Sequence, residues 1–205
     1  SLPTELGMVY TQQELADLYA TCQKYQLRLF IDGARLGYGL MSETCEYDLP
    51  YVAEHCDVFY IGGTKVGAMF GEAVVFSGMK APKYFFTNVK RHGALLAKGR
   101  MLGIQFDTLF TDELYFKISK HAINMAAGIR KIFAKHNIPL AYDSPTNQQF
   151  VILSPTLYQA LSKLVAFEIW EKKNEQEIVC RFVTSWATKE EELEELDKAI
   201  EKCMA

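Results

Sequence analysis

Three side chains that could do chemistry together follow two apolar runs of the sequence. Asp32 and Arg35 stand in the motif Asp-Gly-Ala-Arg, directly after the apolar run 27–31. Lys65 ends the motif Gly-Gly-Thr-Lys, directly after the apolar run 57–61. In open α/β sheets, ligands bind outside the carboxyl ends of the strands. If the two runs form parallel strands, we expect the acid, the arginine and the lysine to meet at one edge of a sheet.

This trio suits pyridoxal 5′-phosphate, which needs a lysine amine for its Schiff base and an anionic partner for its pyridine nitrogen. A carboxylate such as Asp32 keeps that nitrogen protonated, so that the ring can accept electrons from a substrate carbanion. Burial and a neighbouring cation such as Arg35 both lower the pKa of an amine such as Lys65, as this reaction requires near neutral pH. Either motif alone is typical of an ordinary turn. Their order and positions together favour a cofactor site.

Predicted helices and strands alternate around these two motifs. Residues 11–25 predict a helix in which Thr11 and Glu14 form a capping box. The apolar runs before the motifs, and a third run at 73–76, predict buried strands. This alternation predicts an α/β fold, with part of a mostly parallel sheet and its helices over residues 1–111.

The second half of the chain predicts a smaller α+β domain over residues 112–205. Residues 86–110 predict one long helix that leads into it. Thr188 is predicted to cap the last helix, with Glu191 three residues later. The elements expected in the smaller domain are, in chain order, a helix over 112–134, strands over 140–142 and 149–153, a helix over 155–164, strands over 165–170 and 178–186, and a helix over 188–203.

The composition excludes several classes of partner. Of the 205 residues, 49% are hydrophobic and 23% are charged, which is typical of a globular protein. The net charge of -3 gives no electrostatic support for binding to nucleic acid or to an anionic membrane. No apolar run approaches the ~20 residues that a membrane-spanning helix needs.

The cysteines and histidines indicate neither disulfides nor a metal site. The five cysteines are odd in number, are widely spaced and form no Cys-x-x-Cys pair, which favours reduced thiols in a cytoplasmic protein. The four histidines show no spacing typical of metal ligands, so no metal is expected.

The segment Leu-Phe-Ile-Asp-Gly-Ala-Arg-Leu-Gly-Tyr at 29–38, followed by Asp-Val-Phe-Tyr-Ile-Gly-Gly-Thr-Lys at 57–65, resembles the β-eliminating lyase/threonine aldolase family of fold-type I pyridoxal-phosphate enzymes. The resemblance runs over almost the whole chain. It includes Arg-Phe-Val-Thr-Ser-Trp at 181–186, which is similar to the arginine-bearing strand of the family's small domain. It implies the C-terminal part of the family's large domain, followed by the small domain. It also implies retro-aldol cleavage of L-threonine or L-allo-threonine to glycine and acetaldehyde.

The resemblance also implies a role for each motif residue. Asp32 would hold the pyridine nitrogen of the cofactor and Lys65 would form its Schiff base. Thr64, just before the lysine, would lie near the phosphate. Arg35 and Arg181 would bind the substrate carboxylate, because a planar guanidinium is a well-suited bidentate donor to that group.

Arg100 has a weaker match, in Gly-Arg-Met-Leu-Gly at 99–103. The resemblance places there an arginine that reaches the cofactor phosphate, from a neighbouring subunit. An ordinary solvated arginine on a helix surface is the alternative interpretation. Since sites of this family are shared between subunits, the resemblance implies a homodimer or homotetramer.

The chain departs from the family pattern in two places. The lysine of threonine aldolases usually lies in Ser-Lys before a Gly-Leu-Gly-Ala-Pro stretch, whereas here Thr-Lys-Val-Gly-Ala-Met-Phe-Gly-Glu spans 64–72 without the proline. No glycine-rich phosphate loop precedes Asp32, so we expect a missing N-terminal segment that completes the site. Two alternatives therefore stay open: another reaction of the same cofactor, such as β-elimination, racemisation or transamination, and an inactive fragment or cofactor-free domain.

Overall fold

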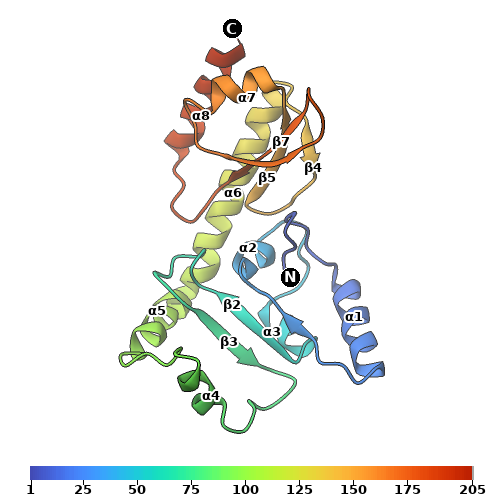
Figure 1. The fold of residues 1–205 in the computed structure, drawn as a ribbon, viewed down its shortest axis with the longest axis vertical. Coiled ribbons are helices and arrows are strands. Elements are labelled where there is room, and N and C mark those ends of the chain that lie inside the picture. Colours follow the sequence, from blue (N-terminus) through green and yellow to red (C-terminus); the bar gives the residue numbers. More distant parts are fainter. Residues whose placement is uncertain (205) are drawn as a thin grey trace.

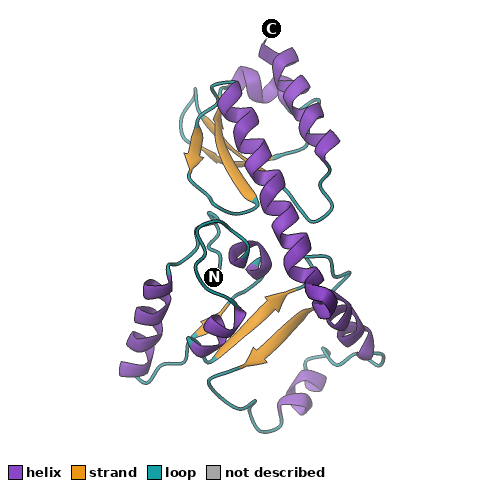
Figure 2. Ribbon diagram, turned by 180° about the vertical axis from the view of Figure 1, so that it is seen from behind, coloured by secondary structure: helices purple, strands orange, loops and turns teal. Residues whose placement is uncertain are grey.

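The chain forms two sheets, each packed against helices, and helix α6 (Leu114–Lys135) runs from one to the other (Figure 1). The structure is a computed structural model that describes residues 1–204. Figure 2 shows from behind how α6 runs from beside the first sheet along the second. The fold is a mixed α/β arrangement, as the sequence predicts.

The first sheet has the strand order β1-β2-β3. Strands β1 (Phe30–Ile31) and β2 (Val58–Gly62) are parallel, whereas β3 (Glu72–Phe76) runs antiparallel to β2. The sheet was expected to be mostly parallel, and among the described residues it has one parallel and one antiparallel pair. The helices of this half are α1 (Gln12–Lys24), α2 (Leu36–Leu40), α3 (Leu49–Glu54), α4 (Phe85–Arg91) and α5 (Arg100–Phe110).

The second sheet is antiparallel throughout, with the order β4-β5-β7-β6. Two helices accompany it, and α8 packs along α6 so closely that a Cβ on Gly128 would lie 2.4 Å from Leu193 Cδ2. The short 3-10 helix η1 (Thr111–Glu113) precedes α6. The elements of this half are β4 (Leu140–Tyr142), β5 (Gln148–Leu153), α7 (Pro155–Leu161), β6 (Glu168–Lys172), β7 (Ile178–Val183) and α8 (Glu190–Met204).

Helix α6 contributes to two separate hydrophobic cores. Tyr115 and Ile123, in its first half, lie in the core of the first sheet. Ile129 and Phe133, in its second half, lie in the core of the second sheet. A domain boundary at residue 112 stays a prediction, and the helix that follows it is part of both cores.

The prediction of one long helix before the second half of the chain is wrong. The single helix expected over 86–110 is two helices, because Gly93 has a φ of +74° and ends α4. The amides of Gly93 and Ala94 donate to the carbonyls of Lys90 and Val89, which is a Schellman motif.

The predicted cap of the last helix is also wrong. Helix α8 begins at Glu190, and the Thr188 hydroxyl instead accepts the amide of Ser185 at 2.9 Å. The capping box of α1 is confirmed, since the Thr11 hydroxyl accepts the Glu14 amide and the Glu14 carboxylate accepts the Thr11 amide.

Two further expectations concern the described residues as a whole. None of the helices within residues 1–204 is long and apolar enough to cross a membrane. All five cysteines are free thiols.

Candidate active site

The two motifs meet at the carboxyl ends of β1 and β2, because these strands are parallel as predicted. Their turns approach so closely that only glycine fits at two positions. A Cβ on Gly33 would lie 1.9 Å from the Tyr60 carbonyl oxygen, and one on Gly62 would lie 2.3 Å from that of Ala34. The Gly62 amide also donates to the Gly33 carbonyl at 2.9 Å. The glycines therefore bring the acid-bearing and lysine-bearing turns together.

Asp32 is a partly buried carboxylate with one oxygen engaged. Its Oδ1 accepts the amide of Ala34 at 3.0 Å and the hydroxyl of Tyr60. Its Oδ2 has no hydrogen-bond partner among residues 1–204. Burial raises the pKa of Asp32, but the hydrogen bonds from Tyr60 and Ala34 and the charge of Lys65 outweigh burial and leave this pKa below its usual value. Asp32 is therefore held in its charged form.

The surroundings of Lys65, in contrast, favour the neutral form of its amine. Partial burial of its amine and the charge of Arg35 lower its pKa, while Asp32 and Glu72 oppose this effect. The side chain is otherwise exposed, and its amine forms no hydrogen bond or ion pair with any described residue. The hydroxyl of buried Tyr38 donates to the Lys65 carbonyl oxygen. The lysine thus has a fixed backbone and an amine whose neutral, nucleophilic form is favoured.

The turn that carries the lysine is bound by Glu72, at the start of β3. Its carboxylate accepts the Gly63 amide at 2.6 Å and the Thr64 hydroxyl at 2.9 Å. No sequence motif indicated Glu72, although the Gly-Glu pair at 71–72 directly precedes a predicted strand. The contact between Thr64 and a cofactor phosphate stays a prediction.

Arg35 and Arg181 come from different halves of the chain. Arg35 precedes α2 and Arg181 lies on β7. Burial is the main cause that lowers the pKa of Arg35, and the charge of Arg181 is the second. Two guanidinium groups that repel each other in a partly buried place are suited to bind one carboxylate between them.

The surroundings of Arg181 hold its side chain in place but leave one donor unused. Its Nη1 donates to Gln148 Oε1 at 3.0 Å, and its Nη2 forms an ion pair with Glu168. The guanidinium lies over the ring of Trp170, 5.3 Å from its centroid. Its Nε is buried without a hydrogen-bond partner. That unsatisfied donor is one that a bound anion would satisfy.

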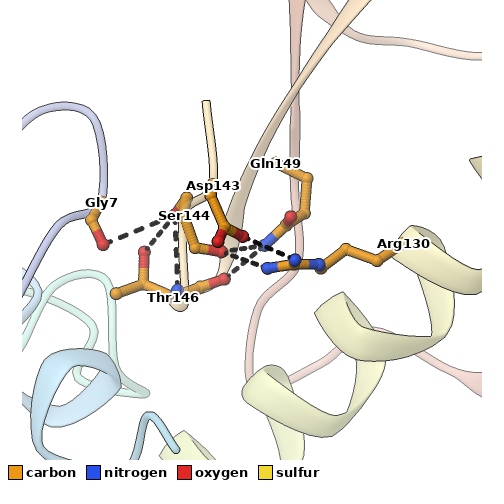
Figure 3. A network of polar contacts seen from close by, with 6 residues as sticks. All are labelled: Gly7, Arg130, Asp143, Ser144, Thr146 and Gln149. Carbon is orange, nitrogen blue, oxygen red and sulfur yellow. Dashed lines mark hydrogen bonds and ion pairs between the residues drawn. The ribbon is translucent and has the colours of Figure 1, made fainter. Parts of the chain in front are cut away.

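A network of polar contacts holds the loop before β5 (Figure 3). Ser144 Oγ lies within hydrogen-bonding distance of the Gly7 carbonyl oxygen and of Thr146 Oγ1. Arg130, on α6, donates to the Ser144 carbonyl at 3.0 Å and to Asp143. Strand β5 begins at Gln148, whose side chain is fully buried and which no sequence pattern indicated.

A cavity of about 570 Å³ lies beside this loop, and its lining includes Met8, Ile123, Arg130 and Gln149. None of the proposed site residues lines it. Since the predicted chemistry lies at the sheet edge, we do not assign the reaction to this cavity.

Arg100 is the one proposed site residue that the structure does not connect to the others. It is the exposed first residue of α5 and forms no hydrogen bond or ion pair with another described residue. Its role at a neighbouring subunit's phosphate stays a prediction.

One group of side chains has the composition of a metal site. His136, Asp197 and Glu201 lie close enough for their ligand atoms to be within 4.8 Å of one another. Lys135 donates to both Asp197 and Glu201, and His136 contacts Asp197 at 2.6 Å. Both carboxylates are therefore already paired with the Lys135 amine, and we interpret the group as an ion-pair cluster between α6 and α8.

A comparison with protein families decides the identity of this fold. The family described as beta-eliminating lyase matches residues 3–156, which is most of the chain. The chain belongs to the beta-eliminating lyase family. This membership confirms the resemblance carried by the two strand-end motifs.

Two curated relatives of this chain are called low specificity L-threonine aldolase. They come from a Pseudomonas species and from Pseudomonas aeruginosa, and each is 30% identical to the chain. Each match covers 98% of this chain and 58% of the relative. The chain thus spans less than two thirds of the length of these relatives.

Solved structures show the same fold. A threonine aldolase from Leishmania major is 38% identical, with a TM-score of 0.95 over 100% of this chain and 60% of that one. A structure from Listeria monocytogenes is 18% identical, with a TM-score of 0.73 over 96% of this chain and 58% of that one, and shows the fold alone.

Asp32 and Lys65 fit pyridoxal 5′-phosphate, the cofactor that the sequence predicts. The free Oδ2 of a charged Asp32 is an acceptor for a protonated ring nitrogen. The Lys65 amine, with its lowered pKa, is the nucleophile that a cofactor aldehyde needs. The two groups follow neighbouring parallel strands and so lie at the same edge of the sheet, where one cofactor would contact both.

Proposed function

We propose that this chain is part of a pyridoxal-phosphate-dependent aldehyde-lyase that cleaves L-threonine and L-allo-threonine to glycine and acetaldehyde. The observation that carries the proposal is the meeting of Asp32 and Lys65 at the ends of two parallel strands. The arginine pair Arg35 and Arg181 supports an amino-acid substrate. The names of the Pseudomonas and Leishmania relatives support threonine as that substrate.

In this proposal, each residue of the strand-end motifs has a defined task. Bound pyridoxal 5′-phosphate supplies a conjugated system that stabilises negative charge on the α-carbon of an amino acid. Asp32 keeps a proton on the ring nitrogen, since its carboxylate stays charged. Lys65 holds the cofactor, and the lowered pKa makes a larger share of its amine neutral near pH 7.

The arginines and the substrate hydroxyl determine which bond breaks. Arg35 and Arg181 bind the substrate carboxylate and so orient the bond between the α- and β-carbons. That bond breaks with its electron pair left on the α-carbon, while the β-hydroxyl loses its proton and becomes the carbonyl of acetaldehyde. The α-carbon then takes up a proton, which gives glycine.

We also propose that the protein works as a homodimer or homotetramer in the cytoplasm. Several large apolar side chains of α4, α5 and the segment between them are exposed, which supports a subunit contact on that side: Phe86, Leu95, Leu96, Met101 and Ile104. The free cysteines support a reducing compartment. Sedimentation analysis of the full-length protein checks the assembly, and a monomer at all concentrations would contradict it.

The test of the cofactor assignment is reduction with borohydride after incubation with pyridoxal 5′-phosphate. We expect a label on the peptide that contains Lys65, lost in Lys65→Ala and kept in the control Lys90→Ala, an exposed lysine of α4. The measurement uses both residues 1–205 and the full-length protein. A label on neither would overturn the assignment.

The test of the reaction is product analysis with different amino acids. We expect the full-length protein to release glycine from L-threonine and L-allo-threonine. If the protein instead releases pyruvate from serine or cysteine and no glycine from threonine, the reaction is β-elimination and not aldol cleavage. The cofactor assignment would still hold.

A further inference from the structure

The carboxylate of Glu72 closes the loop that carries the lysine. Residues 63–71 connect β2 to β3, and Gly62 lies opposite Glu72 in the register of the two strands. From that position the two carboxylate oxygens bind different groups of the same turn. Oε2 accepts the Gly63 amide at 2.6 Å and Oε1 accepts the Thr64 hydroxyl at 2.9 Å.

Two glycines near Glu72 allow the close backbone approach that this contact needs. Gly71 has a φ of +88°, and a Cβ there would lie 2.2 Å from Leu102 Cδ2. A Cβ on Gly63 would lie 2.7 Å from the Gly71 carbonyl oxygen. The two glycines therefore let the ends of the loop touch, and the glutamate bridges them.

The loop itself is tightly turned and is also held from its other side. The amides of Val66 and Ala68 both donate to the Gly63 carbonyl oxygen, at 2.9 and 3.0 Å. The hydroxyl of Tyr38 donates to the carbonyl oxygen of Lys65. Lys65 thus lies between two anchors, of which Glu72 is the only one that is charged at neutral pH.

We propose that Glu72 is a positioning residue for Lys65, which fixes the Gly63–Thr64 turn and adds negative charge beside the amine. This inference rests on the proposed function, in which Lys65 binds the cofactor. In the proposed arrangement, Glu72 orients the Thr64 hydroxyl and holds the backbone of the turn, which fixes the direction of the Lys65 side chain.

Charged groups from four elements act on the Lys65 amine. Asp32 at the end of β1 and Glu72 on β3 raise its pKa, whereas Arg35 before α2 and Arg181 on β7 lower it. Removal of the glutamate charge leaves the two arginines opposed by Asp32 alone. We therefore expect the pKa of the lysine to fall further in a variant without that charge.

Two substitutions separate the geometry from the charge. Glu72→Gln keeps an oxygen for the Gly63 amide and an amide group for the Thr64 hydroxyl, but removes the charge. Glu72→Ala removes both. The matched control is Glu175→Gln, an exposed glutamate of the β6–β7 connection with no side-chain hydrogen bond among the described residues.

The experiment uses the full-length protein without added cofactor and has two measurements. The rate at which acetic anhydride labels Lys65 is recorded against pH, since only the neutral amine reacts. Hydrogen exchange of the 62–66 amides is recorded beside that of β5 and β7. We expect both Glu72 variants to shift the labelling profile to lower pH. We expect only Glu72→Ala to exchange the Gly63 amide at least about tenfold faster, because it alone leaves that amide without a side-chain acceptor.

Two results would overturn the proposal. One is a labelling profile and exchange pattern in both variants that match those of the wild type and of Glu175→Gln. The other is faster exchange in β5 and β7 by as much as in the 62–66 segment, which would mean a general loss of stability. Neither measurement uses cofactor or substrate, so failure of the proposed function, seen as absent borohydride labelling, is a separate outcome.

Discussion

Asp32 and Lys65 both have lowered pKa values within one small site, which favours the charged form of the acid and the neutral form of the amine. Hydrogen bonds from Tyr60 and the Ala34 amide outweigh burial and hold the acid charged, whereas burial and Arg35 favour the neutral lysine. Neighbouring ionisable groups whose pKa values are both shifted from the usual range are typical of catalytic sites. Tyr60, within the segment 57–65, is the residue that lowers the pKa of Asp32 most.

Tyr60→Phe is expected to raise the pKa of Asp32. Its hydroxyl binds the charged form of the carboxylate, so its loss favours the protonated form. Since the charged form is the active one, the acid limb of the rate against pH moves to higher pH. A pH profile of kcat/KM with L-threonine checks this, with the exposed Tyr25→Phe as control. An unmoved acid limb would show that Tyr60 does not set the state of Asp32.

Arg181→Lys is expected to weaken binding of the substrate carboxylate. Lysine cannot reproduce the fork of donors that reaches Gln148 and Glu168 and still leaves Nε free. Loss of a hydrogen bond to a charged group costs about 1.5–3 kcal/mol, which is roughly a 10- to 150-fold rise in KM. Steady-state kinetics check this against Arg91→Lys, an exposed arginine of α4. An unchanged KM would remove Arg181 from the substrate site.

At the scale of elements, glycines decide how closely the segments approach. The turns after β1 and β2 meet at Gly33 and Gly62, and α4 ends at Gly93. Gly7, with a φ of +77°, lets the N-terminal segment lie against the loop before β5 (Figure 3). The same N-terminal segment contacts Gln148, since the Glu5 carbonyl oxygen accepts a hydrogen bond from Gln148 Nε2 at 3.1 Å, and Gln148 in turn contacts Arg181. A contact far from the cofactor edge therefore helps to place a proposed substrate ligand.

Gly7→Ala is expected to destabilise the protein by more than about 1 kcal/mol, because the residue has a positive φ. Its new Cβ would also lie 2.1 Å from Ser144 Oγ. Gly103→Ala, within α5 and with nothing within 4 Å of a new Cβ, is the matched control. It is expected to stabilise by about 0.5–1 kcal/mol, since alanine is the better helix former. Urea unfolding measures both, and equal effects would contradict the argument.

At the scale of the whole molecule, α6 fixes the two halves relative to each other. Its first half packs in the core of the first sheet and its second half in that of the second. The Tyr115 hydroxyl accepts the Gly37 amide and donates to the Gly62 carbonyl, which ties the helix to both sides of the cofactor edge. The relative position of Arg35 and Arg181 therefore depends on this helix.

Asn124→Pro is expected to break α6 at an exposed position between the two cores. Proline within a helix costs about 3 kcal/mol or more, and the bend would also move β7 relative to α2. We expect a lower urea midpoint and a higher KM for L-threonine, while Asn124→Ala keeps both near the wild-type values. A proline variant with the wild-type KM would mean that other contacts hold the two halves together.

The sequence by itself determined the features that depend on neighbouring residues. The capping box of α1 lies within four residues, and each of the two motifs directly follows its own apolar run. The two runs could therefore be recognised as strands, and Asp32 and Lys65 as their strand-end residues. The family resemblance in the same motifs then indicated the cofactor and the reaction.

Only the tertiary structure decided which distant side chains complete the site. Tyr60 reaches Asp32 through the pairing of β1 with β2, and Glu72 reaches the lysine turn through the register of β2 with β3. Gln148 contacts Arg181 because β5 and β7 are neighbours. Tyr60 and Asp32 lie 28 positions apart in the sequence, Gly63 and Glu72 lie 9 apart, and Arg181 and Gln148 lie 33 apart. Strand pairing and core packing set such contacts, and a local sequence pattern holds no information about either.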